Sequence, residues 1–423
     1  DILAAATLGR SVWVMPSASL ELNPAGTLTI TADDAGGNGA GTGTGDNYEI
    51  RLDATGAVLQ VFIDGNFSRS VALGNVTNIV VSGSGDSDSL TVNFANGNPI
   101  PAGGVIFNGG AGNDNLQVDG NNTAMTFQMG TTAGTGRVTA GGRVIDFTGV
   151  EPNTVTLTGT TTITLSLTDG DTVDFSRVSA TRSRAAGTAN AVEFDSPSTQ
   201  LIVNSADANN YTLNFNDLAD AFNPSNGIDI NGNTGDDIIT ITDLGDTFGN
   251  GATGTLDIDT AASANDSVTF QFVAQSFATL SVTARTITGT SAAISVSGAT
   301  ALDASAAGTI TLTNASNDFA GSVTINANSA SIDDDDDITF GAVTTVGNFD
   351  VDAGGAVTFT ALASIGGDLD VDTNINGGRG GSITDTGAGR ILNAGGLMTL
   401  DAGDQPVTLD NPLNDFGAGI DAV

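Results

Sequence analysis

The chain has 423 residues, and its 48 acidic residues against 11 Arg and no Lys give a formal net charge of −37. This balance argues against nucleic acid and anionic membrane surfaces as partners, because both require a basic footprint on the protein. The lack of Cys excludes disulfides, and without His, Cys or Lys the common catalytic bases, nucleophiles and zinc sites are mostly unavailable, so we expect no enzyme.

The N-terminal segment, residues 1–25, differs from the rest of the chain because it is apolar on both faces of a predicted strand. A strand of this kind is normally buried on both sides. It is predicted to be a cap over the first coil of a repeat array, or a strand that adds to the open end of another subunit. The side chains predicted for this interface are Ile2, Leu3, Leu8, Val12, Trp13 and Val14.

Two related β modules are predicted over residues 26–150 and 151–285. Residues 90–120 align with residues 211–243, and each stretch carries a polar Gly/Asn/Asp corner directly before an alternating strand. The corners VSGSGDSDSLTV, which begins at residue 81, and NGGAGNDNLQV, which begins at residue 108, place Gly83 and Gly109 at equivalent positions. Their spacing of about 26 residues is typical of one coil of a parallel β-solenoid, with about 4.8 Å between coils.

The last region, residues 286–423, repeats a shorter unit of one strand and its turn. In the phrases GNFDVDAG and GDLDVDT, strict alternation places Phe349 and Val351 on one face and Asp350 and Asp352 on the other. The predicted fold class is therefore all-β, a parallel β-helix or solenoid with roughly 20 to 27 residues per coil. The alternative is a set of tandem antiparallel β-sandwich domains, which seldom repeat one strand phrase at so short a spacing.

Calcium is the cofactor that the polar corners favour, because it prefers six to eight oxygen ligands from carboxylates, amides and carbonyl groups. Stacking in register would bring Asp86 and Asp114 onto adjacent coils, where two like charges are costly without a cation between them. The alternative is that Asp and Asn close turns by accepting hydrogen bonds from nearby backbone N–H groups. The candidate ligands are Asp86, Asp88, Asn113, Asp114, Asp236 and Asp237.

The densest charge in the chain is the run from Asp333 to Asp337, between Ile332 and Ile338. Runs of this kind are usually solvated loops. A shared cation, or an Arg from a neighbouring subunit, is the alternative.

The end of the chain repeats an earlier phrase. Asn317-Asp318-Phe319 lies between two alternating strands, and Asn414-Asp415-Phe416 occupies the same position close to Val423. A solenoid that stops partway through a repeat, without a polar capping unit, exposes an unpaired edge. We therefore expect Asn414, Asp415 and Phe416 to belong to an assembly interface.

The phrase TLTNASNDFAGSVTI and the later GNFDVDAGGAVTFT resemble the repeats of secreted bacterial exoproteins of the filamentous-haemagglutinin kind. This resemblance covers about residues 285–423 and implies a right-handed parallel β-helix that is exported to the cell surface for adhesion or fibre building. Residues 109–117, GGAGNDNLQ, are similar to the calcium-binding RTX nonapeptide. In that family Gly109, Gly110, Gly112 and Asp114 would hold the turn and Leu116 would point inward.

The function expected from these features is that of an extracellular structural protein that assembles head to tail into a surface filament or matrix with calcium. A head-to-tail contact that does not close produces such a filament. One alternative is an adhesin or stalk segment of a longer exoprotein that binds glycans or surfaces. The other is a polysaccharide-degrading β-helix enzyme, since a pair of carboxylates can cleave a glycoside.

Overall fold

The computed structural model describes residues 20–31, 45–151, 154–168, 170, 172–205, 208–248, 254–260, 263–271, 274–375, 380–393 and 395–422. These residues form an all-β protein in which strands pair mostly in parallel, as expected of a β-solenoid. Within the described residues the one helical element is the 3-10 turn Leu73–Asn75. The predicted fold class is confirmed.

The chain divides into two compact units, the first made of residues 1–121 and 132–158 and the second of residues 122–131 and 159–423. The boundaries predicted at residues 25, 150 and 285 stay predictions. Two strands, β9 (Asn115–Met129) and β12 (Thr154–Leu167), have residues in both units.

The first unit combines two parallel ladders with antiparallel hairpins. One ladder runs β2–β6–β8–β11, and the other runs β3–β7–β9 through residues 115–119. Ser89 pairs with Asn115, which is the register that the spacing of the polar corners predicts. The strands are β1 (Leu20–Leu22), β2 (Thr27–Thr31), β3 (Asn47–Leu52), β4 (Val58–Ile63), β5 (Asn66–Ala72), β6 (Asn78–Ser82), β7 (Ser89–Asn93), β8 (Val105–Asn108), β10 (Gly136–Ala140) and β11 (Arg143–Thr148).

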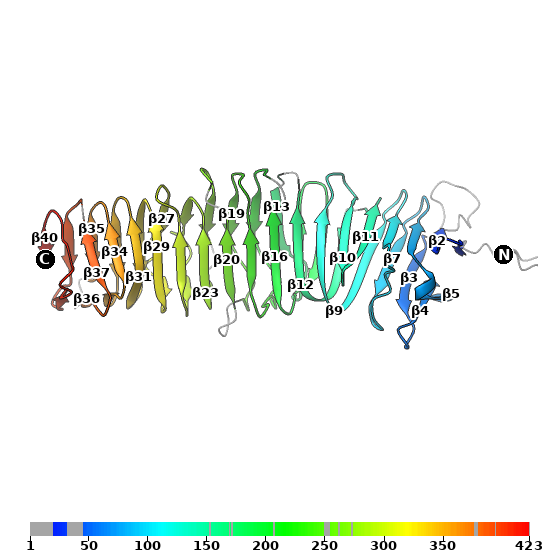
Figure 1. Cartoon of the computed structure of the whole chain (residues 1–423), viewed down its shortest axis with the longest axis horizontal. Coiled ribbons are helices and arrows are strands. Elements are labelled where there is room, and N and C mark those ends of the chain that lie inside the picture. The colour runs from blue at the N-terminus through cyan, green and yellow to red at the C-terminus, as the bar shows by residue number, and fades with distance from the viewer. Residues whose placement is uncertain are drawn as a thin grey trace, which may run out of the picture. The chain divides into compact units, whose positions relative to one another are not determined.

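The second unit is a stack of parallel coils whose strands form successive rungs from green to red in Figure 1. Its longest ladder is here called ladder A. Its strands are β13 (Thr172–Arg177), β17 (Thr212–Phe215), β19 (Ile238–Ile241), β21 (Ser267–Phe270), β24 (Thr286–Thr288), β27 (Thr309–Leu312), β30 (Ser329–Asp334), β32 (Phe349–Ala353), β35 (Leu369–Asp372), β38 (Met398–Asp401) and β40 (Ile420–Ala422).

A second ladder continues from the last part of β12. It contains β16 (Gln200–Ser205), β18 (Ile228–Asn231), β20 (Thr255–Asp259), β23 (Thr279–Thr283), β26 (Thr300–Asp303), β29 (Ser322–Ala327), β31 (Ile338–Thr345), β34 (Leu362–Ile365) and β37 (Arg390–Asn393).

Shorter strands complete the coils of the second unit. A separate sheet contains β22 (Gln275–Phe277), β25 (Ile294–Val296) and β28 (Asp318–Phe319), and β31 also starts the series β33 (Val357–Phe359), β36 (Ile383–Asp385) and β39 (Val407–Thr408). In this unit β14 (Arg182–Ala186) and β15 (Ala191–Asp195) form an antiparallel excursion beside β13. The parallel registers therefore decide against the sandwich alternative.

Coil length varies along the second unit. Ile238 of β19 pairs with Ser267 in the next coil, and Phe349 of β32 pairs with Leu369, which is a smaller step along the chain. Leu369 in turn pairs with Met398, which is again a longer step. The shorter coils predicted from residue 300 onward are therefore present up to β35 but not in the coil that follows it.

The core of the second unit consists of apolar side chains stacked in register. In ladder A one buried row runs Leu213, Ile239, Val268, Ile287, Ile310, Ala330, Phe349, Leu369 and Met398. Period-2 alternation sends the intervening polar residues to the outer face of the coil. Burying each large side chain of such a row contributes about 1.5 to 3 kcal/mol, so every coil is stabilised by the coils above and below it.

Candidate functional site

The polar corners of the first unit hold buried aspartates. Asp88 and Asp114 directly precede β7 and the first residues of β9, and each side chain is buried. Asp114 Oδ1 accepts the N–H of Asp88 at 2.7 Å, and Asp88 Oδ1 accepts the N–H of Asp46 at 2.7 Å. Asp88 Oδ2 also accepts the N–H of Ser84 at 2.6 Å. Each carboxylate therefore pairs with the backbone of the preceding coil.

The second unit repeats this arrangement with Asp237 and Asp266, which are also buried. Asp237 Oδ1 accepts the N–H of Tyr211 at 3.1 Å, and Asp266 Oδ1 accepts the N–H of Asp237 at 2.7 Å. Sequence reasoning did not select Asp266. The sequence did contain the information needed to select Asp266, because Asp266 occupies the same position in the corner TAASANDSVTF as Asp114 does in NGGAGNDNLQV.

The six predicted calcium ligands do not converge on one point. The strand register places Asp88, and not Asp86, beside Asp114. The backbone carbonyl oxygen of Asp86 lies 2.3 Å from the position of a Cβ at Gly112 (φ +131°), so the backbone of Asp86 packs against a glycine. Asp236 accepts hydrogen bonds from Asn265 Nδ2 at 2.9 Å and Ser263 Oγ at 3.0 Å, which lower its pKa.

The remaining predicted ligand, Asn113, is exposed, and its N–H donates to Ser87 Oγ at 3.2 Å. Over the part of the chain that the structure describes, no group of three or more Asp or Glu side chains forms a metal site. Among the described residues the buried oxygen Asp114 Oδ2 has no hydrogen-bond partner, and burial raises the pKa of this carboxyl group. Asp88, Asp114 and Asp237 accept hydrogen bonds from backbone N–H groups, as the turn alternative expects, whereas Asp236 accepts them from side chains.

The acidic run divides between two environments. Asp333 and Asp334 belong to β30, whereas Asp335, Asp336 and Asp337 form the exposed corner after it. Asp334 is buried, its Oδ2 accepts the N–H of Phe319 at 2.8 Å, and burial raises its pKa to about 6. Asp337 Oδ1 accepts the N–H of Ala356 at 2.6 Å, so the run ties successive coils together.

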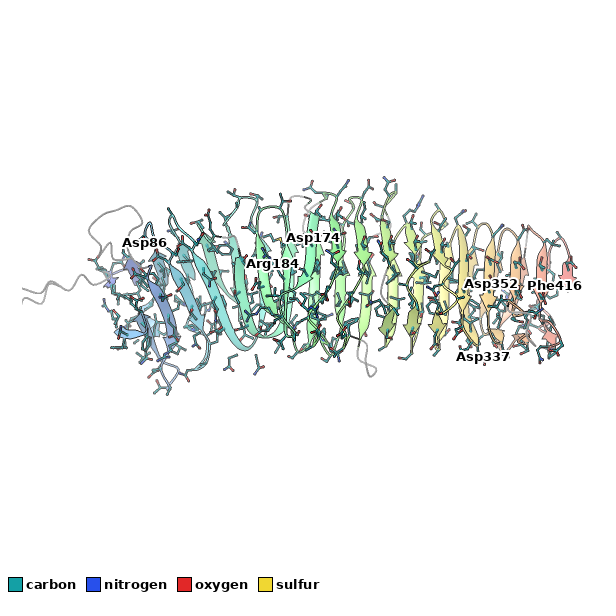
Figure 2. All side chains as sticks on the ribbon, turned by 180° about the vertical axis from the view of Figure 1, so that it is seen from behind. Asp86, Asp174, Arg184, Asp337, Asp352 and Phe416 are labelled. Atoms are coloured by element: carbon teal, nitrogen blue, oxygen red, sulfur yellow. The ribbon has the colours of Figure 1, made fainter. Side chains whose placement is uncertain are left out.

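Parallel register aligns outward aspartates into two columns along ladder A, here called the acidic columns. One contains Asp333, Asp352, Asp372 and Asp401, and the other contains Asp350 and Asp370. Burial, followed by the neighbouring carboxylates, raises the pKa of Asp352 to about 6 and raises the pKa of Asp370. Figure 2 labels Asp352 on the outside of these coils. Like charges directly opposite on neighbouring strands are destabilising.

The repeated Asn-Asp-Phe phrase has one structural role at both positions. Asn317 Oδ1 accepts the N–H of Ile294 at 2.9 Å, and Asn414 Oδ1 accepts the N–H of Ile391 at 2.8 Å. Asn317 and Phe319 are buried, whereas Asn414 and Phe416 (labelled in Figure 2) are half-buried and Asp415 is exposed. The same corner is therefore built twice, with less covering it the second time.

The last coil exposes apolar side chains, and we call this surface the end face. Its members are Val407 (39% exposed), Leu413 (61%) and Ile420 (47%). In the preceding coil the register partners of Val407 and Ile420 are Ile383 and Met398, which are fully buried. The exposure results from the lack of a covering coil among the described residues.

The N-terminal interface residues, Ile2, Leu3, Leu8, Val12, Trp13 and Val14, lie outside the described residues. Where the chain is described, no helix is long and apolar enough to cross a membrane.

Residues 234–326, 327–378 and 364–422 match the model of a family described as repeats of unknown function (DUF5649). These stretches all lie in the second unit. The short coils are similar to these repeats. No curated protein and no solved structure matches the chain. The repeat architecture is thus supported by both the family match and the coil register.

Proposed function

We propose that this chain is an extracellular structural protein whose solenoid associates end to end into a filament or matrix. The observation that carries the proposal is the end face, where Val407 and Ile420 are exposed although their register partners in earlier coils are buried. Another coil packed on this face would bury them together with Leu413, and each large apolar side chain contributes about 1.5 to 3 kcal/mol when fully buried. A second copy supplies such a coil by adding strands in parallel register.

The apolar stretch from Ile2 to Met15 is the counterpart that the sequence offers for the end face. A contact between opposite ends is heterologous and continues into a filament instead of closing. The resemblance of residues 285–423 to filamentous-haemagglutinin repeats supports the same function and a place outside the cell. The acidic composition suits an exterior medium in which salt screens repulsion beyond about 10 Å at 0.1 M ionic strength.

Calcium is proposed as a stabilising ion of this assembly. Residues 300–423 contain eighteen Asp and two Arg, so the acidic columns have little basic charge nearby in the sequence to offset their repulsion. Carboxylate oxygens are ligands that calcium prefers.

Sedimentation velocity and negative-stain electron microscopy over a concentration series test the proposal. The unaltered protein is expected to form linear assemblies, and Leu413→Asp, Ile420→Asp or removal of residues 1–19 should return it to monomers. Val346→Asp is the matched control, because Val346 is 55% exposed but lies between β31 and β32 rather than on the end face. Monomers of the unaltered protein at every concentration, with and without Ca²⁺, would contradict end-to-end association.

A further inference from the structure

A hollow of about 410 Å³ opens on the outer face of ladder A at the level of β30. The hollow exists because the outer side chains of β30 are shorter than those of the strands on either side. Ser331 lies in register between Thr311 of the preceding coil and Asp350 of the following coil, and Ser329 lies beside Thr309. Gly347 and Asn348 line the hollow on the side of the following coil. Serine reaches less far from the sheet than its neighbours, and Gly347 has no side chain to fill the gap.

The polar groups around this hollow have unused hydrogen-bonding capacity. Ser331 Oγ donates to Asp350 Oδ2 at 2.9 Å, which orients the carboxylate and leaves Oδ1 without a partner among the described residues. Asn348 Oδ1 accepts the N–H of Asp368 at 3.0 Å, so its Nδ2 remains to donate. The hollow is therefore lined by oriented donors and acceptors, contributed by Thr311, Asn328, Ser329, Ser331, Asn348 and Asp350.

The charge around the hollow restricts its ligand. Asp350 lies beside Asp370 of the next coil and two residues before Asp352 of the same strand, so an anionic ligand would meet repulsion from these carboxylates. A cation would satisfy Asp350 but would leave the free Nδ2 donor of Asn348 without an acceptor, because Asn348 Oδ1 is already used by the N–H of Asp368. A neutral ligand rich in hydroxyl groups satisfies both sets, because hydroxyls donate to a carboxylate and accept from amides and other hydroxyls.

We propose that this hollow is a binding site for a neutral saccharide. Adjacent sugar hydroxyls donate to Asp350 Oδ1, while sugar oxygens accept from the side chains of Asn348 and Ser329. The volume lies within the range of about 300 to 1,000 Å³ that small-molecule sites occupy. The site is independent of end-to-end association, since it lies on the side of the coils and not on the end face.

Calorimetric titration of the full chain with maltotetraose, cellotetraose, mannobiose and N-acetylchitotriose, in buffer containing EDTA, tests the proposal. At least one of these neutral saccharides is expected to bind. Asp350→Asn should weaken binding about tenfold or more, because it removes a charge-assisted hydrogen bond. Ser331→Trp should abolish binding by filling the hollow.

Two matched variants serve as controls. Thr269→Trp occupies the same column as Ser331 three coils earlier, and Asp404→Asn removes a charge from an exposed position after β38, outside the lining. Both should leave the affinity within about twofold of the unaltered protein, as expected for distant sites. Polygalacturonate is titrated in parallel as an anionic saccharide. Absence of binding by all four neutral saccharides, unchanged binding by Ser331→Trp, or tighter binding of polygalacturonate would overturn the proposal. Sedimentation of Ser331→Trp should match that of the unaltered chain, which separates this test from the assembly proposal.

Discussion

At the scale of single residues, buried polar side chains at the corners hold successive coils in register. Asn317 is fully buried, accepts the N–H of Ile294, and donates through Nδ2 to the carbonyl oxygens of Leu312 at 3.0 Å and Asp333 at 3.2 Å. One side chain thus satisfies backbone groups from three segments. A backbone group that loses such a partner inside a protein costs free energy because water cannot replace it.

Replacing Asn317 with Ala should lower the free energy of unfolding by about 2 to 4 kcal/mol, because it leaves several buried backbone groups unsatisfied. Asn414→Ala removes the equivalent contact in a half-exposed corner and should cost less. Urea unfolding followed by circular dichroism measures both, with exposed Ser316→Ala as the control. Equal losses for the two Asn variants would show that burial does not set the cost.

Asp237 provides a second test at this scale. Asp237→Ala removes the acceptor of the Tyr211 and Asn233 N–H groups inside the protein and should destabilise it by about 2 to 4 kcal/mol. Its neighbour Asp236 accepts hydrogen bonds from the side chains of Ser263 and Asn265, so Asp236→Ala should have a smaller effect. Hydrogen exchange at Tyr211 should accelerate in the first variant. Unchanged exchange there would contradict the proposed role of the carboxylate.

At the scale of elements, the strands of ladder A carry a uniform inner face and a varying outer face. The inner row is apolar from Leu213 to Met398, whereas the outer face changes from Ser and Thr on β21 to β30 to Asp on β30 to β38. Stability comes from the inner row, so outer residues can vary without loss of fold. The acidic columns therefore lower the free energy of unfolding without preventing the fold.

This cost has a defined dependence on pH. The folded-state pKa of Asp352, about 6, exceeds the ordinary value of 3.8, so the folded protein binds this proton more tightly than the unfolded chain does. The resulting stabilisation is fully present below the ordinary pKa and is lost as pH rises through about 6. Asp333 and Asp370, whose pKa values are raised, act in the same direction.

The melting temperature should therefore rise as pH is lowered from about 7 to about 5, the reverse of ordinary acid denaturation. The double variant Asp352→Asn and Asp370→Asn should melt higher than the unaltered protein at pH 7 and show a flatter pH profile. Asp404→Asn, an exposed site beyond the columns, should keep the original profile. Differential scanning calorimetry decides, and a melting temperature that falls steadily below pH 7 would contradict the prediction.

At the scale of the whole molecule, each unit is an array in which a coil is stabilised chiefly by its neighbours. Such arrays gain stability from each interface between coils. Val407, Leu413 and Ile420 are exposed on the end face of the second unit. The proposed assembly converts the end face into one more interface of the same kind.

Removal of calcium should lower the melting temperature, because an ion that binds the folded state alone stabilises it by mass action. The double variant Asp352→Asn and Asp372→Asn should respond less to EDTA than the unaltered protein if the acidic columns hold the ion. A reduced response of Asp86→Ala would locate it at the polar corners instead. An unchanged melting curve in excess EDTA would leave Asp86, Asp114 and Asp236 as turn residues.

Repetition and alternation in the sequence were sufficient to predict the fold class, because a period of two and a recurring corner are local properties of the chain. The predicted coil length holds for the coil from Ser89 to Asn115, but the hairpins and excursions of other coils make them longer, as in the step from Thr172 to Thr212. The pairing of Ser89 with Asn115 and the inward Phe349 and Val351 are both present in the structure. The candidate site was predicted less well. Choosing between calcium ligands and turn residues at Asp88 and Asp237 required knowing which backbone N–H groups lie opposite their carboxylates.

The sequence by itself determined that this protein is an acidic, repetitive β chain without the residues for cysteine, histidine or lysine chemistry. The spacing of the polar corners predicted the pairing of Ser89 with Asn115, whereas the tertiary structure decided most other contacts across coils, because coils of unequal length join positions that no fixed spacing pairs. That register buries Asp88 and Asp114, aligns the acidic columns, opens the hollow beside Ser331 and leaves Ile420 uncovered. Each of these depends on the side chain one coil away, which packing rather than sequence proximity selects.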